Sequence, residues 1–173
     1  MTTLQRSTTP SLSTVEASET ATFDSTARAG VATGTAPVAH ARAWFALSQH
    51  SFRRVALVPA DASVSSLPIA RAIVAASQTY SVKLARLLAG EGVSAGSIHV
   101  LLEELARCDA FPGQTIVTTG SPLVEPGAIS IARAADACVL IVQLGRTTLR
   151  DARETMTSIG EDRFIGSLAV TAP

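Results

Sequence analysis

The hydrophobic pattern divides the chain into a segment without a period and a longer stretch in which two periods alternate. Before about Pro37, apolar residues recur at a spacing of neither 2 nor 3.6 residues. From Val38 onward, short apolar runs typical of buried strands alternate with stretches in which apolar residues return every three or four positions, as on a helix. The pattern predicts one folded domain over residues 38–173, preceded by a tail over residues 1–37.

The folded part contains alternating predicted strands and helices. The strands are expected at residues 53–59, 114–119, 137–144 and 164–170, and residues 81–88 fit either a strand or a helical turn, with the strand preferred. The helices are expected at residues 38–52, 66–80, 97–109, 127–135 and 147–159. This alternation predicts an α/β fold with a mainly parallel sheet flanked by helices.

The sequence also predicts where particular side chains lie on the helices and at their ends. In the first helix, Trp44 and Phe45 are expected to share the inner face. Ser66 is an N-cap candidate for the second helix. Asp136, just before the most apolar strand, is interpreted as the cap of a helix end in preference to a residue that orients a loop.

The tail is dominated by Ser, Thr and Ala, with 15 Ser or Thr residues by Thr35. Such a segment cannot bury enough apolar surface to offset the entropy cost of ordering it, about 1–2 kcal/mol per residue. We therefore expect residues 1–37 to be disordered. A solvated leader without a specific role is preferred over a flexible tether or a phosphoacceptor segment.

Composition and charge exclude several classes of function. Fourteen basic residues balance fourteen acidic ones, so no net field favours nucleic acid or an anionic membrane. No apolar run approaches the length of a membrane span, and the first thirty residues lack the apolar core of a secretory signal. Cys108 and Cys138 match no metal or redox spacing, which favours buried thiols in a reducing compartment. A cytoplasmic location is expected.

Ligands in open parallel sheets bind at the carboxyl ends of the strands, so the first strand-to-helix loop is the place to look for a phosphate site. A working P-loop needs glycines, a lysine and a Ser or Thr that binds magnesium. Residues 59–66 (PADASVSS) contain neither Gly nor Lys, and Asp61 places a carboxylate in the loop. Only Ser65 and Ser66 remain as vestigial phosphate-loop candidates.

Over residues 53–170 the chain resembles the bacterial tyrosine kinases and ParA/MinD-like P-loop ATPases that accompany polysaccharide copolymerases in capsule and exopolysaccharide export. The match lies in four segments: RRVALVPADASVSSLPIARAIV, IVTTGSP (residues 116–122), AADACVLIVQLGRT (residues 134–147) and RFIGS (residues 163–167). The resemblance implies a degenerate P-loop NTPase-like fold. It places Val64 at the P-loop lysine, Ser65 at the magnesium-binding hydroxyl and Thr119 at the Walker B aspartate.

Those replacements remove the groups that would neutralise a transferred phosphoryl group, so no catalytic residue, cofactor or metal is expected. His40, His50 and His99 are far apart in sequence, and the thiol of Cys138 lies in the most apolar strand, where burial raises its pKa. The sequence contains no HExxH or GxSxG motif.

The leading functional hypothesis is a non-catalytic regulatory or scaffolding protein of exopolysaccharide or a similar envelope polymer, which acts by docking to another protein. Arg146, Arg150 and Arg153 are the docking candidates. The partner would be a membrane polysaccharide copolymerase, a synthase subunit or a division protein, and a homo-oligomer is also compatible with the sequence. Two alternatives stay open: a divergent ATPase or tyrosine kinase that still binds nucleotide, and a SulA-like division inhibitor or MinD-like placement factor.

Overall fold

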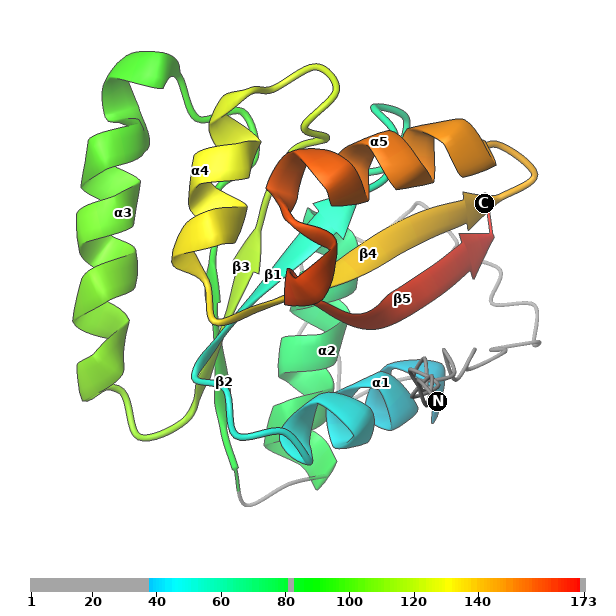
Figure 1. Ribbon diagram of the computed structural model, residues 1–173. Helices are drawn as coiled ribbons and strands as arrows, with labels where there is room; N and C mark the ends of the chain where they lie inside the picture. Colours follow the sequence, from blue (N-terminus) through cyan, green and yellow to red (C-terminus); the bar gives the residue numbers. More distant parts are fainter. Residues whose placement is uncertain (1–37, 81–82, 172–173) are drawn as a thin grey trace, which may run out of the picture.

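The computed structural model describes residues 38–80 and 83–171 (Figure 1). The strands are β1 (Arg54–Pro59), β2 (Ala85–Leu88), β3 (Gln114–Thr118), β4 (Ala137–Leu144) and β5 (Phe164–Thr171). The α-helices are α1 (Val38–Ser48), α2 (Leu67–Tyr80), α3 (Ile98–Arg107), α4 (Gly127–Ala134) and α5 (Leu149–Ile159). The predicted tail, residues 1–37, lies outside the described residues.

All five strands belong to one parallel sheet in the order β2-β3-β1-β4-β5. The central strand β1 continues through α2 to β2, whereas its neighbour β3 continues through α4 to β4 on the other side of β1. This arrangement confirms the predicted α/β fold with a parallel sheet flanked by helices.

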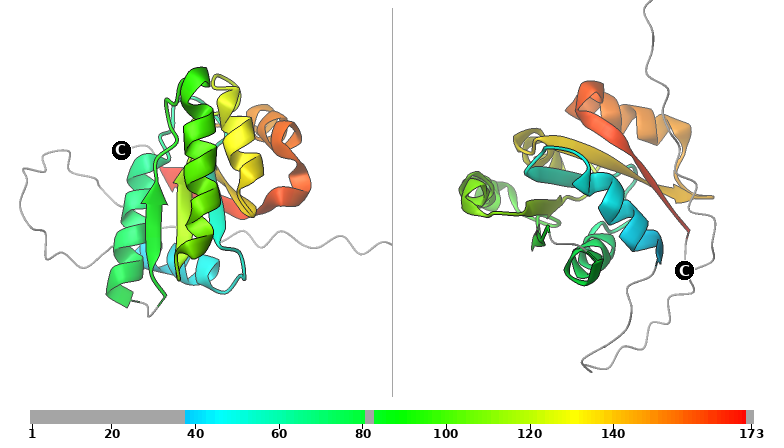
Figure 2. Two further views of the ribbon diagram at one scale, coloured as in Figure 1. Left: turned by 90° about the vertical axis from the view of Figure 1, so that its left-hand side faces the viewer. Right: turned by 90° about the horizontal axis from the view of Figure 1, so that it is seen from below.

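Helices cover both faces of the sheet: α1 and α2 lie on one face, and α3, α4 and α5 lie on the other (Figures 1 and 2). Successive side chains of β1 point to opposite faces of the sheet, so this strand contributes to the hydrophobic core on each face. Val55 and Leu57 join the core beneath α1 and α2, while Ala56 and Val58 pack with residues of α4 and α5. Because both faces of β1 are buried, its sequence is a continuous apolar run rather than an alternating one.

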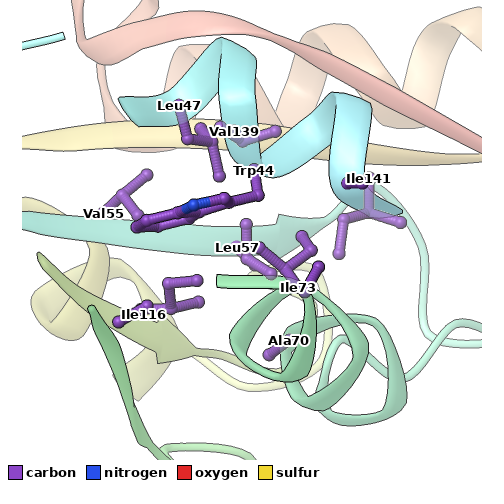
Figure 3. Packing of buried hydrophobic residues seen from close by; sticks show 12 residues of the cluster. Trp44, Leu47, Val55, Leu57, Ala70, Ile73, Ile116, Val139 and Ile141 are labelled. Carbon is purple, nitrogen blue, oxygen red and sulfur yellow. The ribbon is translucent and has the colours of Figure 1, made fainter. Parts of the chain in front are cut away.

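Trp44 anchors α1 to the sheet. Its fully buried ring lies among Leu47, Val55 and other residues of the α1–α2 core (Figure 3). The expectation that Phe45 shares this inner face is wrong, because Phe45 is 46% exposed. Successive helical residues point about 100° apart, and the contact stripe of α1 follows Ala41, Trp44 and Leu47 at a spacing of three.

Strand β2 confirms the preference for a strand over part of residues 81–88. Only Ala85–Leu88 pair with a neighbour, at residues 114–117 of β3. The N–H of Ala85 donates to the buried Ser77 hydroxyl oxygen at 3.1 Å, which fixes the strand against the last turn of α2. Lys83 and Leu84 precede the strand and are exposed, and residues 81–82 are not described.

Asp136 joins the amino ends of β1 and β4 and does not cap a helix, so the interpretation as a cap is wrong. One carboxylate oxygen accepts the backbone N–H groups of Arg53 and Arg54, each at 2.9 Å, and the other accepts the Arg54 guanidinium at 2.7 Å. Burial raises the pKa of Asp136, but these donors and the charge of Arg54 outweigh burial, so the pKa lies below its ordinary value.

Candidate functional site

The carboxyl ends of β1, β3 and β4 meet at one edge of the sheet, because these neighbouring strands are parallel. The chain leaves β1 toward β2 on one face and leaves β3 toward β4 on the other face. This reversal between neighbouring strands is the position where doubly wound proteins bind nucleotides and other ligands. The loop over residues 60–66 and the start of α2 therefore form the candidate site.

A carboxylate occupies the start of α2. One oxygen of Glu91 accepts the Ser65 hydroxyl at 2.7 Å, and the other accepts the backbone N–H of Leu67 at 2.8 Å and contacts the Ser66 hydroxyl. The first turn of a helix offers unpaired N–H groups and a partial positive charge, which attract an anion. Glu91 thus supplies the anion at the start of α2.

The structure brings the two phosphate-loop candidates together but gives them other partners. Ser66 is fully buried, and its hydroxyl lies 3.0 Å from the carbonyl oxygen of Thr119 as well as against Glu91. Ser66 has the backbone position of an N-cap, since its carbonyl accepts the N–H of Ala70, but Glu91 performs the side-chain role. Val64 is half-buried against the α1–α2 core.

Two glycines place Glu91 where it caps α2. The N–H of Gly90 donates to the Thr118 hydroxyl at 3.1 Å, and a Cβ on Gly90 would lie 2.5 Å from the Thr118 carbonyl oxygen. Gly92 has φ +68°, which favours glycine, and its N–H donates to a carboxylate oxygen of Glu125 at 3.2 Å. Sequence reasoning missed Glu91, although a Gly-Glu-Gly loop after a parallel strand must reach this same edge of the sheet.

Asp61 fastens the loop after β1 to the loop after β4. Its carboxylate accepts the backbone N–H of Ser63 at 2.8 Å and the hydroxyls of Ser63 and Thr147. The Thr147 hydroxyl oxygen in turn accepts the N–H of Gln143 at 2.8 Å. Burial raises the pKa of Asp61, yet the hydroxyl and N–H donors and the charge of Arg146 bring it below the ordinary value. Asp61 is therefore an ionised member of a closed hydrogen-bond network.

Thr119, which the sequence resemblance places at the Walker B aspartate, makes hydrogen bonds to the backbone. It is fully buried, and its hydroxyl donates to the carbonyl of Leu57 at 3.2 Å. Its own carbonyl faces Ser66, as described above. These contacts join the ends of β1 and β3 to the start of α2.

The docking candidates Arg146, Arg150 and Arg153, together called the arginine rim, are all exposed. Arg146 lies in the turn after β4, and the other two lie on α5. Arg150 and Arg153 border a shallow depression on the outer face of α5 that also includes Leu149 and Glu154. Thr148 caps α5, since its hydroxyl oxygen accepts the N–H of Asp151 at 3.1 Å.

The cysteines are buried, as expected. Burial raises the pKa of the Cys138 thiol to about 11, despite the opposing charge of Arg163, so the thiolate is scarce near neutral pH. Cys108 lies under α3, where its sulfur contacts the Arg86 guanidinium. Among residues 38–80 and 83–171, no group of three or more His, Cys, Asp or Glu side chains could hold a metal ion.

These features define an all-parallel α/β protein whose architecture is compatible with a P-loop-like scaffold and whose helix start is capped by a side-chain carboxylate. No protein-family model matches the chain, and no curated protein is significantly similar to it. None of the helices in the described part of the chain is both long and apolar enough to span a membrane.

Proposed function

We propose that this chain is a non-catalytic binding protein built on a P-loop-like scaffold, and that it acts by docking to another protein. The observation that carries the proposal is the Glu91 carboxylate at the start of α2, where it holds the Leu67 N–H and the Ser65 and Ser66 hydroxyls. Because the N–H and hydroxyl donors at this helix start already bind a carboxylate of the same chain, their role is structural.

Electrostatics favour this interpretation over nucleotide binding. A phosphate brought within about 4 Å of the Glu91 carboxylate would meet a repulsion of about 4 kcal/mol per pair of unit charges at the effective dielectric of a protein surface. Asp61 and Glu125 add negative charge to the same edge of the sheet. The single lysine of the chain, Lys83, precedes β2, whereas Glu91 follows β2. The lysine is therefore at the other end of this strand from the candidate site.

The docking side of the proposal is supported by the surface around the arginine rim. Leu144 is 54% exposed and Leu149 is 67% exposed, and both lie beside Arg146 and Arg150 in the sequence. Arginine beside exposed apolar side chains is typical of the core of protein interfaces, because the guanidinium makes directed hydrogen bonds while its stem covers apolar surface. The partner class that the sequence resemblance favours is a component of envelope-polymer synthesis or export.

Addition of magnesium and ATP should leave the melting temperature of the protein unchanged. A ligand at one hundred times its dissociation constant would add about 2.7 kcal/mol to the free energy of unfolding, which a thermal melt detects readily. Differential scanning fluorimetry with millimolar MgATP, MgGTP and inorganic phosphate provides the measurement. A rise of several degrees with a nucleotide would contradict the proposal and favour a divergent ATPase.

Replacement of Arg146 and Arg150 by glutamate should abolish capture of the partner without a loss of stability. Buried interface arginines contribute at least about 1–2 kcal/mol each to binding, whereas exposed substitutions change stability by about 0.5 kcal/mol or less. Proteins captured from the source cells would be compared between the parent, Arg146→Glu/Arg150→Glu and Arg71→Glu, an exposed control on α2. A partner that both variants retain equally would remove the rim from consideration.

A further inference from the structure

The sheet ends on β2 at one edge and on β5 at the other (Figures 1 and 2), and these two strands differ in length and charge. At one edge, β2 has four residues and includes Arg86. At the other edge, β5 has eight residues, Phe164–Thr171, with no charged side chain, and its recorded strand pairing is with β4 alone. Soluble proteins usually keep edge strands short or place charges on them, because an open edge offers backbone groups to any other strand. Among the described strands, only β5 lacks both protections at an edge.

Arg86 shows how the β2 edge is covered. Its guanidinium donates to the Thr115 hydroxyl oxygen at 3.1 Å and lies 5.2 Å from the centre of the Phe111 ring. A strand added to β2 would have to accommodate this charged, fixed group. Nothing comparable occurs along residues 164–171, so the contrast points to β5 as an interface.

An apolar groove of about 240 Å³ runs beside β5 on the face covered by α1. Ala43 and Ala46 of α1 line one wall, β5 lines the other, and Leu57 and Val139 lie at its base. Ile165, on the β5 wall, is 39% exposed. At Gly166 an added Cβ would meet no atom within 4 Å, so the surface is open there. The two helices on this face leave the last strand partly uncovered.

We propose that β5 pairs with β5 of a second copy of this chain, antiparallel about a two-fold axis at Leu168. In that register Leu168 lies opposite the partner's Leu168, and Gly166 lies opposite the partner's Val170. The open space above Gly166 accommodates the partner's Val170, and the same contact is repeated on the other side of the axis. Such an isologous contact closes on itself and joins both sheets into one.

The choice of a second copy as the occupant follows from the neutral sequence of β5. Self-pairing of a charged strand would place like charges across from one another, which destabilises a sheet. Residues 164–171 (FIGSLAVT) bring no charge to the pair in any register. Pairing at β5 also leaves Arg146, Arg150 and Arg153 of both copies accessible, because they lie beyond the carboxyl end of β4 and on α5. The dimer is therefore independent of the proposed docking function.

Sedimentation velocity of the full chain from about 5 to 100 µM tests the proposal, since mass action populates a dimer as concentration rises. We expect a dimer in the parent and a monomer in Gly166→Lys, because the open space at Gly166 admits a lysine in the monomer but not opposite the partner's Val170. Leu84→Lys, which puts the same charge on an exposed residue beside the β2 edge, is the control and should stay dimeric.

Circular dichroism melts would establish that each variant folds. If Gly166→Lys does not fold, Ile165→Lys takes its place in the experiment. As an independent test of register, Leu168→Cys should give a covalent dimer with a short thiol-specific cross-linker, because directly opposed residues of antiparallel strands bring their Cβ atoms within about 4.5–5.5 Å. A parent that stays monomeric at 100 µM would overturn the proposal. Equal dissociation of the Gly166→Lys and Leu84→Lys variants would overturn it as well.

Discussion

Replacement of Trp44 by alanine should lower the free energy of unfolding by about 3–5 kcal/mol, because the ring is fully buried between α1 and the sheet and alanine would leave a large cavity. Trp44 extends from α1 toward the sheet, among Leu47 and Val55 (Figure 3). Its indole N–H is buried without a hydrogen-bond acceptor, so the contribution is one of packing. Trp44→Phe should therefore retain most of the stability.

Urea denaturation followed by far-ultraviolet circular dichroism is the suitable measurement, because Trp44 is the single tryptophan and its fluorescence is lost in both variants. Phe45→Ala supplies the matched control, an aromatic truncation one residue away on the exposed side of α1. Its cost should stay below about 1 kcal/mol. Equal losses at positions 44 and 45 would mean that α1 packs in another orientation.

Replacement of Asp136 by asparagine should lower the free energy of unfolding at neutral pH by about 1–2 kcal/mol, since hydrogen bonds to a charged acceptor contribute more than neutral ones and partial exposure of the side chain reduces the effect. The carboxylate accepts two backbone N–H groups of β1 in addition to the Arg54 guanidinium, with its side chain 31% exposed. An asparagine amide can satisfy only part of that set.

The sign of the pH dependence follows from the low pKa of Asp136 in the folded state. Its stabilising contribution is complete above the unfolded pKa of about 3.9 and disappears as pH falls through the lower folded value. The parent and Asp136→Asn should therefore differ by a constant amount from neutral pH down to about pH 4 and converge at more acidic pH. Asp109→Asn is the control, because that carboxylate is 59% exposed and lies 4.0 Å from Arg54. Convergence at a pH above 5 would contradict this account.

The order and type of the elements could be predicted because each depends on local pattern. Residues 137–144 are apolar throughout, as a strand between two helical layers must be, and Thr148 with Asp151 forms a recognisable helix start. Phe45 could not be placed, because a short helix rich in alanine allows several inner faces, and contact with the sheet decides between them. The short span of β2 depends likewise on the length of its single neighbour, β3.

The candidate site was predictable as a location but not as a set of contacts. Parallel topology requires the loops after β1, β3 and β4 to share an edge, and Ser65 and Ser66 do lie there. The partner of these serines comes from 25 residues further along the chain, at Glu91, so no pattern within the loop predicts it. The open edge at β5 is a similar case, because strand order is decided by contacts between distant segments.

The Glu91 cap restricts how a phosphate site could form in this loop. A lysine placed at position 64 would precede Ser65 at a helix start that already holds a carboxylate. A phosphate would then have to displace Glu91 as well as bind the lysine. Removal of Glu91 alone would leave the first turn of α2 without its acceptor. Neither substitution is favourable by itself, so a phosphate site at this loop would require both changes together.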